Sequence, residues 1–344
     1  MVMQDSIDIL KTLDVYKPEI RQGTMLPIGA PIPGGLNPSS ASAMELPVGT
    51  PIATGIVDGL GGSLASLDPL QAKSNPVPIE NRLSIVVGTS TIYIASSQSA
   101  KTIEGAWGPI PSALGGIYHN IVGQSAAGAL IDHIVSSHPA HAIAIDESVE
   151  RQQTISHYLN ETLKSMAEKG QSLSMLTHDI HLLPYFAGNR CPKMDMSLKE
   201  MVIGLELDKS IENLALTYLA CIQAIALGAR HNIELLTQHG YHFTELRPCG
   251  GLAKNPLFIQ EHVNIAGIQA KMPQEPDCML LSSALVASVA CGVFASIEDA
   301  IQVMSHQKET VYPDTSLKEY YDRKYRFFLE LYEDQQKYRK IMNR

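Results

Sequence analysis

The sequence predicts an α/β protein, because strand-like apolar runs alternate with helix patterns and glycines mark the junctions between them. At one junction an apolar run at residues 52–57 leads directly into Asp58. At another, a run at residues 244–249 leads into Gly250-Gly251, after which a helix pattern opens with Asn255. Ligands of layered α/β sheets gather at the carboxyl ends of strands, so both junctions are candidate binding positions.

Composition indicates a soluble protein with enough apolar material for one or two ordinary cores. The chain has 344 residues, of which 45% are hydrophobic and 18% are charged. Its formal net charge is -9 and no basic stripe is visible, so nucleic acid is not expected as a partner. The most apolar run, at residues 214–229, is shorter than the ~20 residues that a bilayer span needs, so no membrane partner is expected.

Cysteine and histidine usage predicts a reducing compartment and no protein-held metal. The five cysteines are far apart in the sequence, are odd in number and form no C-x-x-C pair. This pattern favours buried free thiols over a disulfide framework or a zinc site. The 12 histidines do not cluster at metal-ligand spacing. The first 16 residues contain three aspartates and do not read as a signal peptide, so the predicted location is the cytoplasm.

The first 81 residues are expected to hold a few short elements and a linker. Asn37 and Pro38 are typical of an N-cap and a first helical turn. The expected order is an amphipathic helix at 6–15, a Pro- and Gly-rich connector at 22–37, a helix from 38 to about 45, a strand at 52–57, a helix from 59 to about 67 and a linker at 68–81.

Residues 82–344 are expected to form a larger α/β domain that begins with a hairpin at 83–95. Apolar residues spaced by three and four predict a long helix from 211 to about 239, with Gly240 as its stop signal. The other expected elements are strands at 244–249 and 268–272 and helices near 125–136, 145–168, 256–266, 280–291, 296–306 and 317–343.

Two segments of this domain have the residue types of a phosphate or nucleotide seat. In Gly88-Thr89-Ser90 the glycine permits a positive φ, and the following amides and hydroxyls can point at phosphate oxygens. Taken by itself, that triplet is better explained as an ordinary β-hairpin turn. Gly250 and Gly251 let the backbone lie close against a ligand, and Asn255 caps the helix beside them. A plain strand-to-helix turn is the alternative for this segment.

Together these segments resemble the phosphate and adenosine motifs of the FGGY carbohydrate kinases, which have the actin-like ATPase (ribonuclease H-like) fold. The resemblance runs from roughly Tyr16 to the C-terminus and is strongest to the ribulose or pentulose kinase branch. Further segments carry it: Trp107-Gly108-Pro109, Gly123-Gln124-Ser125, Leu130-Ile131-Asp132-His133, Gly188-Asn189-Arg190-Cys191-Pro192 and Gln223-Ala224-Ile225-Ala226-Leu227-Gly228.

The resemblance implies an ATP-dependent kinase that transfers phosphate to a ketopentose such as D-ribulose, with ATP and Mg²⁺ as cofactors. Asp58 would be the general base for the sugar hydroxyl, with a helix cap as the alternative role. The implied nucleotide-binding residues are Gly88, Thr89, Ser90, Gly128, Gly250, Gly251 and Asn255.

The roles of three further residues, Gly128, Trp107 and Arg190, are also predicted. Gly128 is explained equally well as a helix-packing glycine. Trp107 is expected in the core or at a lobe interface, and Arg190 is expected to tie its loop by hydrogen bonds.

The sequence also departs from the family pattern. Family members begin with a domain whose first hairpin carries an Asp-x-Gly-Thr phosphate loop, and this segment is not found here. We therefore expect residues 1–81 to be the C-terminal remnant of the first, sugar-binding domain, and residues 82–344 to be a complete second, nucleotide-binding domain. Leu60 replaces a histidine common in relatives, and Leu281-Ser282-Ser283-Ala284 stands where relatives tend to have Gly-Ala-Ala, although serines are small enough to preserve close helix packing.

Two other functions stay open at this point. The chain could be a non-catalytic nucleotide-binding or interaction module that is inactive without the missing lobe. It could also be an actin-fold ATPase of the chaperone or filament type, although the segments around Trp107, Arg190 and Gln223 favour sugar kinases. A homodimer is a possible state, because an apolar face left without its lobe tends to find a partner.

Overall fold

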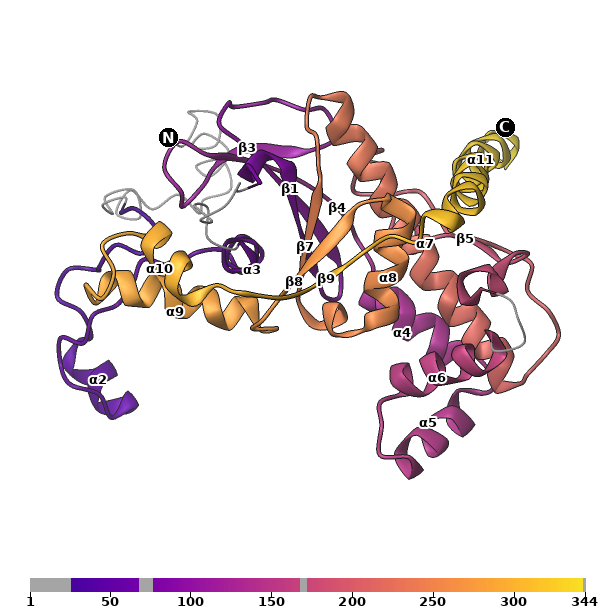
Figure 1. Cartoon of the computed structure of the whole chain (residues 1–344), viewed down its shortest axis with the longest axis horizontal. Helices are drawn as coiled ribbons and strands as arrows, with labels where there is room; N and C mark the ends of the chain where they lie inside the picture. Colours follow the sequence, from indigo (N-terminus) through magenta and orange to yellow (C-terminus); the bar gives the residue numbers. More distant parts are fainter. Residues whose placement is uncertain (1–25, 68–76, 168–171, 343–344) are drawn as a thin grey trace.

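The computed structural model describes residues 26–67, 77–167 and 172–342 and centres on a seven-stranded sheet (Figure 1). The strand order is β3-β4-β2-β1-β7-β8-β9. These strands are β1 (Arg82–Val87), β2 (Thr91–Ser97), β3 (Trp107–Pro111), β4 (Tyr118–Gln124), β7 (Glu245–Cys249), β8 (Gln269–Pro273) and β9 (Gln307–Val311), and a separate pair is formed by β5 (His181–Leu183) and β6 (Met201–Ile203).

The central strand β1 sets the polarity of the sheet. It pairs antiparallel with β2 in the predicted hairpin and parallel with β7, which in turn pairs parallel with β8. The carboxyl ends of β1, β7 and β8 therefore lie at the same edge of the sheet, where ligands of α/β proteins usually bind.

Helices cover both faces of the sheet, as Figure 1 shows. Alternate residues of β1 enter different cores: Leu83, Ile85 and Val87 pack with α7 and α8, whereas Val86 packs with α3, α9 and α10. The helices are α2 (Pro38–Met44), α3 (Asp58–Ser66), α4 (Gly128–Ser137), α5 (His141–Glu150), α6 (Ile155–Ala167), α7 (Ile211–Gln238), α8 (Pro256–Ala266), α9 (Cys278–Ala290), α10 (Ile297–Met304) and α11 (Lys318–Met342), with short 3-10 turns η2 (Ile79–Asn81), η3 (Leu173–Thr177), η4 (Gly251–Lys254) and η5 (Thr315–Leu317).

The long helix α7 is the core of this arrangement. Among the described residues it is the one helix long and apolar enough to cross a membrane. Its most apolar stretch of 18 residues is 83% buried inside the protein. It packs against α4, α6 and α8, which is typical of a core helix. Its Ser210 cap and its end before Gly240, at φ +79°, match the predicted bounds closely.

Several predicted elements are confirmed and two are wrong. Helix α2 has Asn37 as its N-cap and α8 spans the predicted residues. The expected strand at 52–57 is instead an extended segment with one isolated bridge, Pro31 to Ala53, because prolines in residues 27–33 interrupt its partner. The expected helix at 145–168 is two helices, α5 and α6, separated at Gln152, whose φ is +56°. The helix expected at 6–15 and most of the linker lie outside the described residues.

Candidate functional site

The hairpin turn Gly88-Thr89-Ser90 lies at the carboxyl end of β1 and is hydrogen-bonded to the start of α4. The amides of Ala127 and Gly128 donate to the carbonyls of Thr89 and Gly88 at 2.9 and 3.0 Å. The left-handed conformation expected at Gly88 is wrong, because Gly88 is not among the described glycines with positive φ. The hydrogen bonds from the start of α4 stabilise the turn, which has no residue in the left-handed conformation at Gly88.

Gly128 is required by this contact. A Cβ on Gly128 would lie 2.8 Å from the Gly88 carbonyl oxygen, which is closer than real Cβ atoms approach. The helix-packing role is therefore present in the structure. A contact between Gly128 and a nucleotide stays a prediction.

The glycine pair after β7 places two different demands on the backbone. Gly250 has φ +98°, and a Cβ there would overlap the Val87 carbonyl oxygen. Gly251 is exposed, and a Cβ there would meet no atom within 4 Å. Gly250 thus allows the loop to pack closely against the end of β1. Gly251 leaves the outer surface of the loop backbone uncovered by a side chain.

Asn255 caps α8, as predicted, and also ties that helix to two others. Its Oδ1 accepts from the Leu257 amide at 3.1 Å and from Asn160 Nδ2 at 3.0 Å. Its Nδ2 donates to the Tyr218 hydroxyl at 2.6 Å, and that hydroxyl donates to Asn160 Oδ1 at 3.3 Å. Burial raises the pKa of Tyr218 to about 12, so the hydroxyl keeps the proton that it donates.

No sequence pattern identified the two partners of Asn255. Tyr218 lies within the apolar face predicted for α7, and Asn160 stands in an Asn-x-Thr triplet that is common by chance. Asn160 is 6% exposed and hydrogen-bonded, so its side chain is not presented to solvent.

Asp58 is the first residue of α3, and the capping role considered for it is wrong. The N-cap is Val57, and the Asp58 carboxylate accepts from the amide of its neighbour Gly59 at 2.7 Å. The Asp58 side chain is exposed. A negative charge in the first turn of a helix is favourable, but this contact leaves most of the carboxylate open to solvent.

Close backbone approaches bring these segments to one end of the sheet. A Cβ on Gly59 would lie 2.5 Å from Ile92 Cδ1, two residues beyond the hairpin turn. Gly250 meets Val87 and Gly128 meets Gly88 on the other side of the same turn. The predicted site residues of α3, the hairpin, α4 and the glycine pair are therefore neighbours in space, and Asn255 opens the helix that follows.

Trp107 and Arg190 differ from expectation. Trp107 is 44% exposed on β3 at the end of the sheet, so the core assignment is wrong and the interface assignment stays a prediction. The Arg190 guanidinium lies 5.0 Å from the Trp107 ring centroid, a cation–π contact in place of the hydrogen bonds expected for it.

The cysteines are free, as predicted, and four of the five are buried. Cys291 is exposed, contrary to expectation, because it follows the last buried turn of α9. Hydrogen bonding with Cys278 and burial raise the pKa of Cys249, so its thiol stays protonated beside Gly250. Within residues 26–67, 77–167 and 172–342, no group of three or more His, Cys, Asp or Glu side chains is placed to hold a metal.

Comparison with known families identifies the architecture. A family model for the C-terminal domain of the FGGY family of carbohydrate kinases matches residues 83–291. The chain is also 39% identical, over 92% of its length, to an FGGY carbohydrate kinase domain-containing protein of Xenopus laevis. This chain belongs to the FGGY family.

Two further similar proteins are longer than this chain. A D-ribulokinase of Saccharomyces cerevisiae is 29% identical over 70% of this chain and 36% of its own. The crystal structure of a xylulose kinase from Rhodospirillum rubrum superposes with a TM-score of 0.66 at 20% identity, over 91% of this chain and 57% of that one. The predicted actin-like ATPase fold is confirmed. The chain spans 58% of the Xenopus laevis relative.

One departure from the FGGY pattern has a clear structural outcome. Ser282 is 3% exposed on α9, and a Cβ on Gly61 of α3 would lie 2.5 Å from its Oγ. The serine thus preserves the close α3–α9 packing, as its small size predicts.

Proposed function

We propose that this chain supplies the nucleotide-binding half and the catalytic carboxylate of an ATP-dependent kinase that acts on a ketopentose such as D-ribulose. The observation that carries the proposal is the meeting of Asp58, the turn at 88–90 and the pair Gly250-Gly251 at one end of the sheet. The D-ribulokinase and xylulose kinase relatives support the class of sugar. The free cysteines support a cytoplasmic location.

The residues present fit a nucleotide. Cβ atoms at Gly88 and Gly251 would both meet open space, so the surfaces of the two loops are bare where a phosphate chain would lie. Thr89 and Ser90 bring hydroxyl donors to the same edge, and phosphate groups favour such loops of amides and hydroxyls. Gly251 and the start of α8 would receive the adenosine.

The residues also fit magnesium that arrives with the nucleotide. Mg²⁺ is usually held by one or two carboxylates together with substrate phosphates and water. A dedicated cluster of such side chains is lacking in the part of the chain that the structure describes, so Mg²⁺ would be bound mainly by the phosphates of the nucleotide and by water. The metal would neutralise charge on the transferred phosphoryl group.

Asp58 would take the proton from the sugar hydroxyl that attacks the terminal phosphate. A protein promotes phosphoryl transfer mainly by positioning the reactants and neutralising charge. One carboxylate directed at the sugar hydroxyl therefore suffices as the general base. Leu60, in the first turn of α3, would replace a histidine of relatives near the sugar and shift specificity.

The test combines nucleotide binding with turnover. Calorimetric titration of the chain with MgADP should give saturable heat. In a protein that carries the N-terminal FGGY lobe ahead of this chain, D-ribulose should stimulate ADP release. Asp58→Asn should lower that turnover by about 10²–10⁴-fold with MgADP affinity nearly unchanged.

Other results of these experiments would argue against specific parts of the proposal. Wild-type turnover in Asp58→Asn would remove this residue from the mechanism. Saturable MgADP binding without sugar-dependent turnover would favour the non-catalytic module. No heat at millimolar MgADP from a folded sample would contradict the nucleotide seat.

A further inference from the structure

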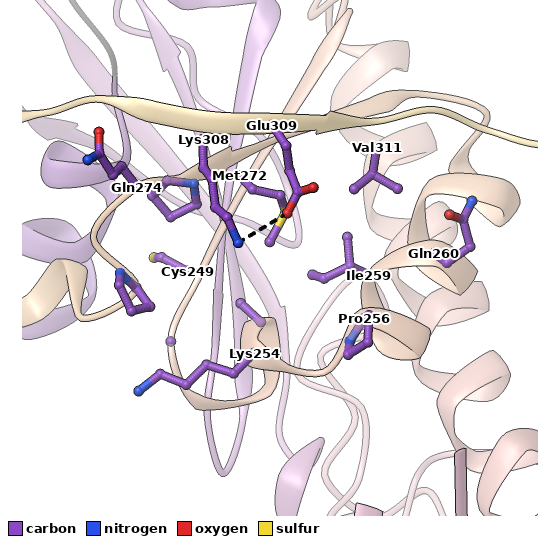
Figure 2. Close-up of a pocket in the computed structure, with 14 residues that line it drawn as sticks. Cys249, Lys254, Pro256, Ile259, Gln260, Met272, Gln274, Lys308, Glu309 and Val311 are labelled. Atoms are coloured by element: carbon purple, nitrogen blue, oxygen red, sulfur yellow. Dashed lines mark ion pairs between the residues drawn. The ribbon is translucent and has the colours of Figure 1, made fainter. Parts of the chain in front are cut away.

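A cavity of about 440 Å³ lies beside the loop that follows β7, where β8 and β9 form its other walls (Figure 2). Small-molecule sites in proteins commonly have volumes of about 300–1,000 Å³. The lining consists of residues from the glycine loop, α8, the end of β8 and β9: Cys249, Gly250, Ala253, Lys254, Pro256, Ile259, Gln260, Met272, Pro273, Gln274, Pro276, Lys308, Glu309 and Val311.

This cavity is separate from the proposed nucleotide face. The Asn255 side chain is bonded to Asn160 of α6 and Tyr218 of α7, on the side of the loop where α4 holds the hairpin turn. The cavity is instead bounded by Pro256, Ile259 and Gln260, which share one face of α8 at helical spacing, and by β8 and β9. Neither α4, α6 nor α7 contributes to its lining.

Its wall suits a ligand with a compact apolar body. Ile259 is 3% exposed, and Met272 and Val311 are half-buried, so the inner surface is aliphatic. Pro256 and Pro276 add rigid apolar surface at the sides. Figure 2 shows Met272, Ile259 and Val311 converging on the space between the loop and β9.

The residues that line the cavity include more cations than anions. The lining holds two ammonium groups, Lys254 and Lys308, against the one carboxylate of Glu309, although the net charge of the chain is -9. Lys254 is engaged with Asp277 at 3.1 Å. Lys308 is therefore the cation best placed to meet a ligand.

Lys308 is held only weakly. Its ammonium lies 3.7 Å from the Glu309 carboxylate, which is longer than a hydrogen bond, and the two side chains are 69% and 60% exposed. Exposed pairs of this kind contribute little to stability, so a bound anion can compete for the ammonium. Figure 2 shows the Lys308 side chain reaching over the cavity toward Glu309.

We propose that this cavity is a second ligand site, which binds a small organic anion with a compact apolar body. The anionic group would bind Lys308 and the apolar body would rest on Ile259, Met272 and Val311. The site shares the Gly250–Lys254 backbone with the nucleotide face but does not depend on kinase activity.

The test uses 8-anilinonaphthalene-1-sulfonate, an aromatic sulfonate, on the full chain. Labelling the methionine methyl groups with ¹³C gives a local readout, and Met272→Leu assigns the Met272 signal. The sulfonate should shift the Met272 methyl signal saturably. Lys308→Glu should weaken that binding at least about tenfold, equivalent to ~1.4 kcal/mol.

Lys337→Glu is the matched control. Lys337 is also 69% exposed and lies 3.8 Å from Asp334 in a similar pair, but it is on α11 and outside the cavity. This variant should bind the sulfonate as the wild type does. An unshifted Met272 signal at saturating sulfonate, or equal affinities of the two glutamate variants, would overturn the proposal.

Discussion

Gly250 and Gly251 are adjacent and have different physical roles, which gives a paired prediction at the residue scale. Gly250→Ala should lower the free energy of unfolding by about 3 kcal/mol, because it combines φ +98° with overlap of the Val87 carbonyl. Gly251→Ala should change stability by less than about 0.5 kcal/mol, because its Cβ meets open space. It should instead weaken MgADP binding on the order of tenfold. Urea denaturation and calorimetry on both variants check the pair, and equal stability losses would contradict it.

His262 predicts how stability depends on acid. It is 3% exposed, and its Nδ1 donates to the Phe258 carbonyl at 2.8 Å, while burial lowers its pKa from 6.5 to about 4. Between these values the unfolded state binds the extra proton, so this stabilising contribution is complete above pH 6.5 and is lost as the pH falls toward 4. The loss is on the order of 3 kcal/mol.

The experiment compares two histidines with the same local bond. Exposed His239 bonds the Leu235 carbonyl at 2.9 Å, also four residues back along its helix. Between pH 6.5 and 4, His262→Leu should reduce the slope of the unfolding free energy against pH by the equivalent of up to one bound proton. His239→Leu should leave that slope as it is in the wild type. Parallel pH profiles of the wild type and His262→Leu would refute this.

At the scale of elements, Asn255 joins three helices, so its loss should cost more than that of a simple cap. Asn255→Ala removes the cap of α8, worth about 0.5–2 kcal/mol, and leaves Asn160 and Tyr218 without their partner, at about 1–3 kcal/mol more. Ser296→Ala, at the exposed cap of α10, should cost only about 1 kcal/mol. Thermal unfolding of both variants tests the difference, and similar costs would show that the three-helix link adds little.

The predictability of elements followed their local signals. Helix α8 was predicted well because Asn255, Pro256 and Gly267 mark its ends. Strands β3, β4, β5, β6 and β9 were not predicted. Strands β3 and β9 lie at the ends of the sheet, where Pro109 or Lys308 and Glu309 replace the apolar alternation of a buried strand. Strand β4 contains polar residues such as His119 and Asn120, and β5 and β6 have three residues each. The break between α5 and α6 has no Gly or Pro to announce it.

At the scale of the whole molecule, the sequence could predict the members of the candidate site but not their mutual contacts. Glycine pairs and strand ends are visible in sequence, so Asp58, Gly88 and Gly250 could be named. The approach of Gly128 to the hairpin turn and the link from Asn255 to Asn160 join residues about 40 and 95 positions apart in the sequence. Such contacts depend on packing that no local pattern records.

The last prediction concerns self-association. The segment before α3 exposes apolar side chains that a soluble protein usually covers: Ile32, Met44, Leu46, Val48 and Val57, of which Met44, Val48 and Val57 are 61%, 65% and 67% exposed. The helix α3 does not add to this surface, because seven of its nine residues are buried against α9 and the sheet. The segment at 32–57 is therefore an apolar surface available for association.

We predict that the chain dimerises or forms larger assemblies at micromolar concentration through this segment. Replacing Met44, Leu46 and Val48 together by Gln, Gln and Thr should shift sedimentation velocity profiles toward the monomer, with the unfolding temperature little changed because these side chains are exposed. Val303→Thr on α10, where the side chain is 59% exposed outside the segment, is the control and should leave association unchanged. A monomeric wild-type chain at tens of micromolar, or equal association of the triple variant and the control, would show that these side chains do not drive self-association.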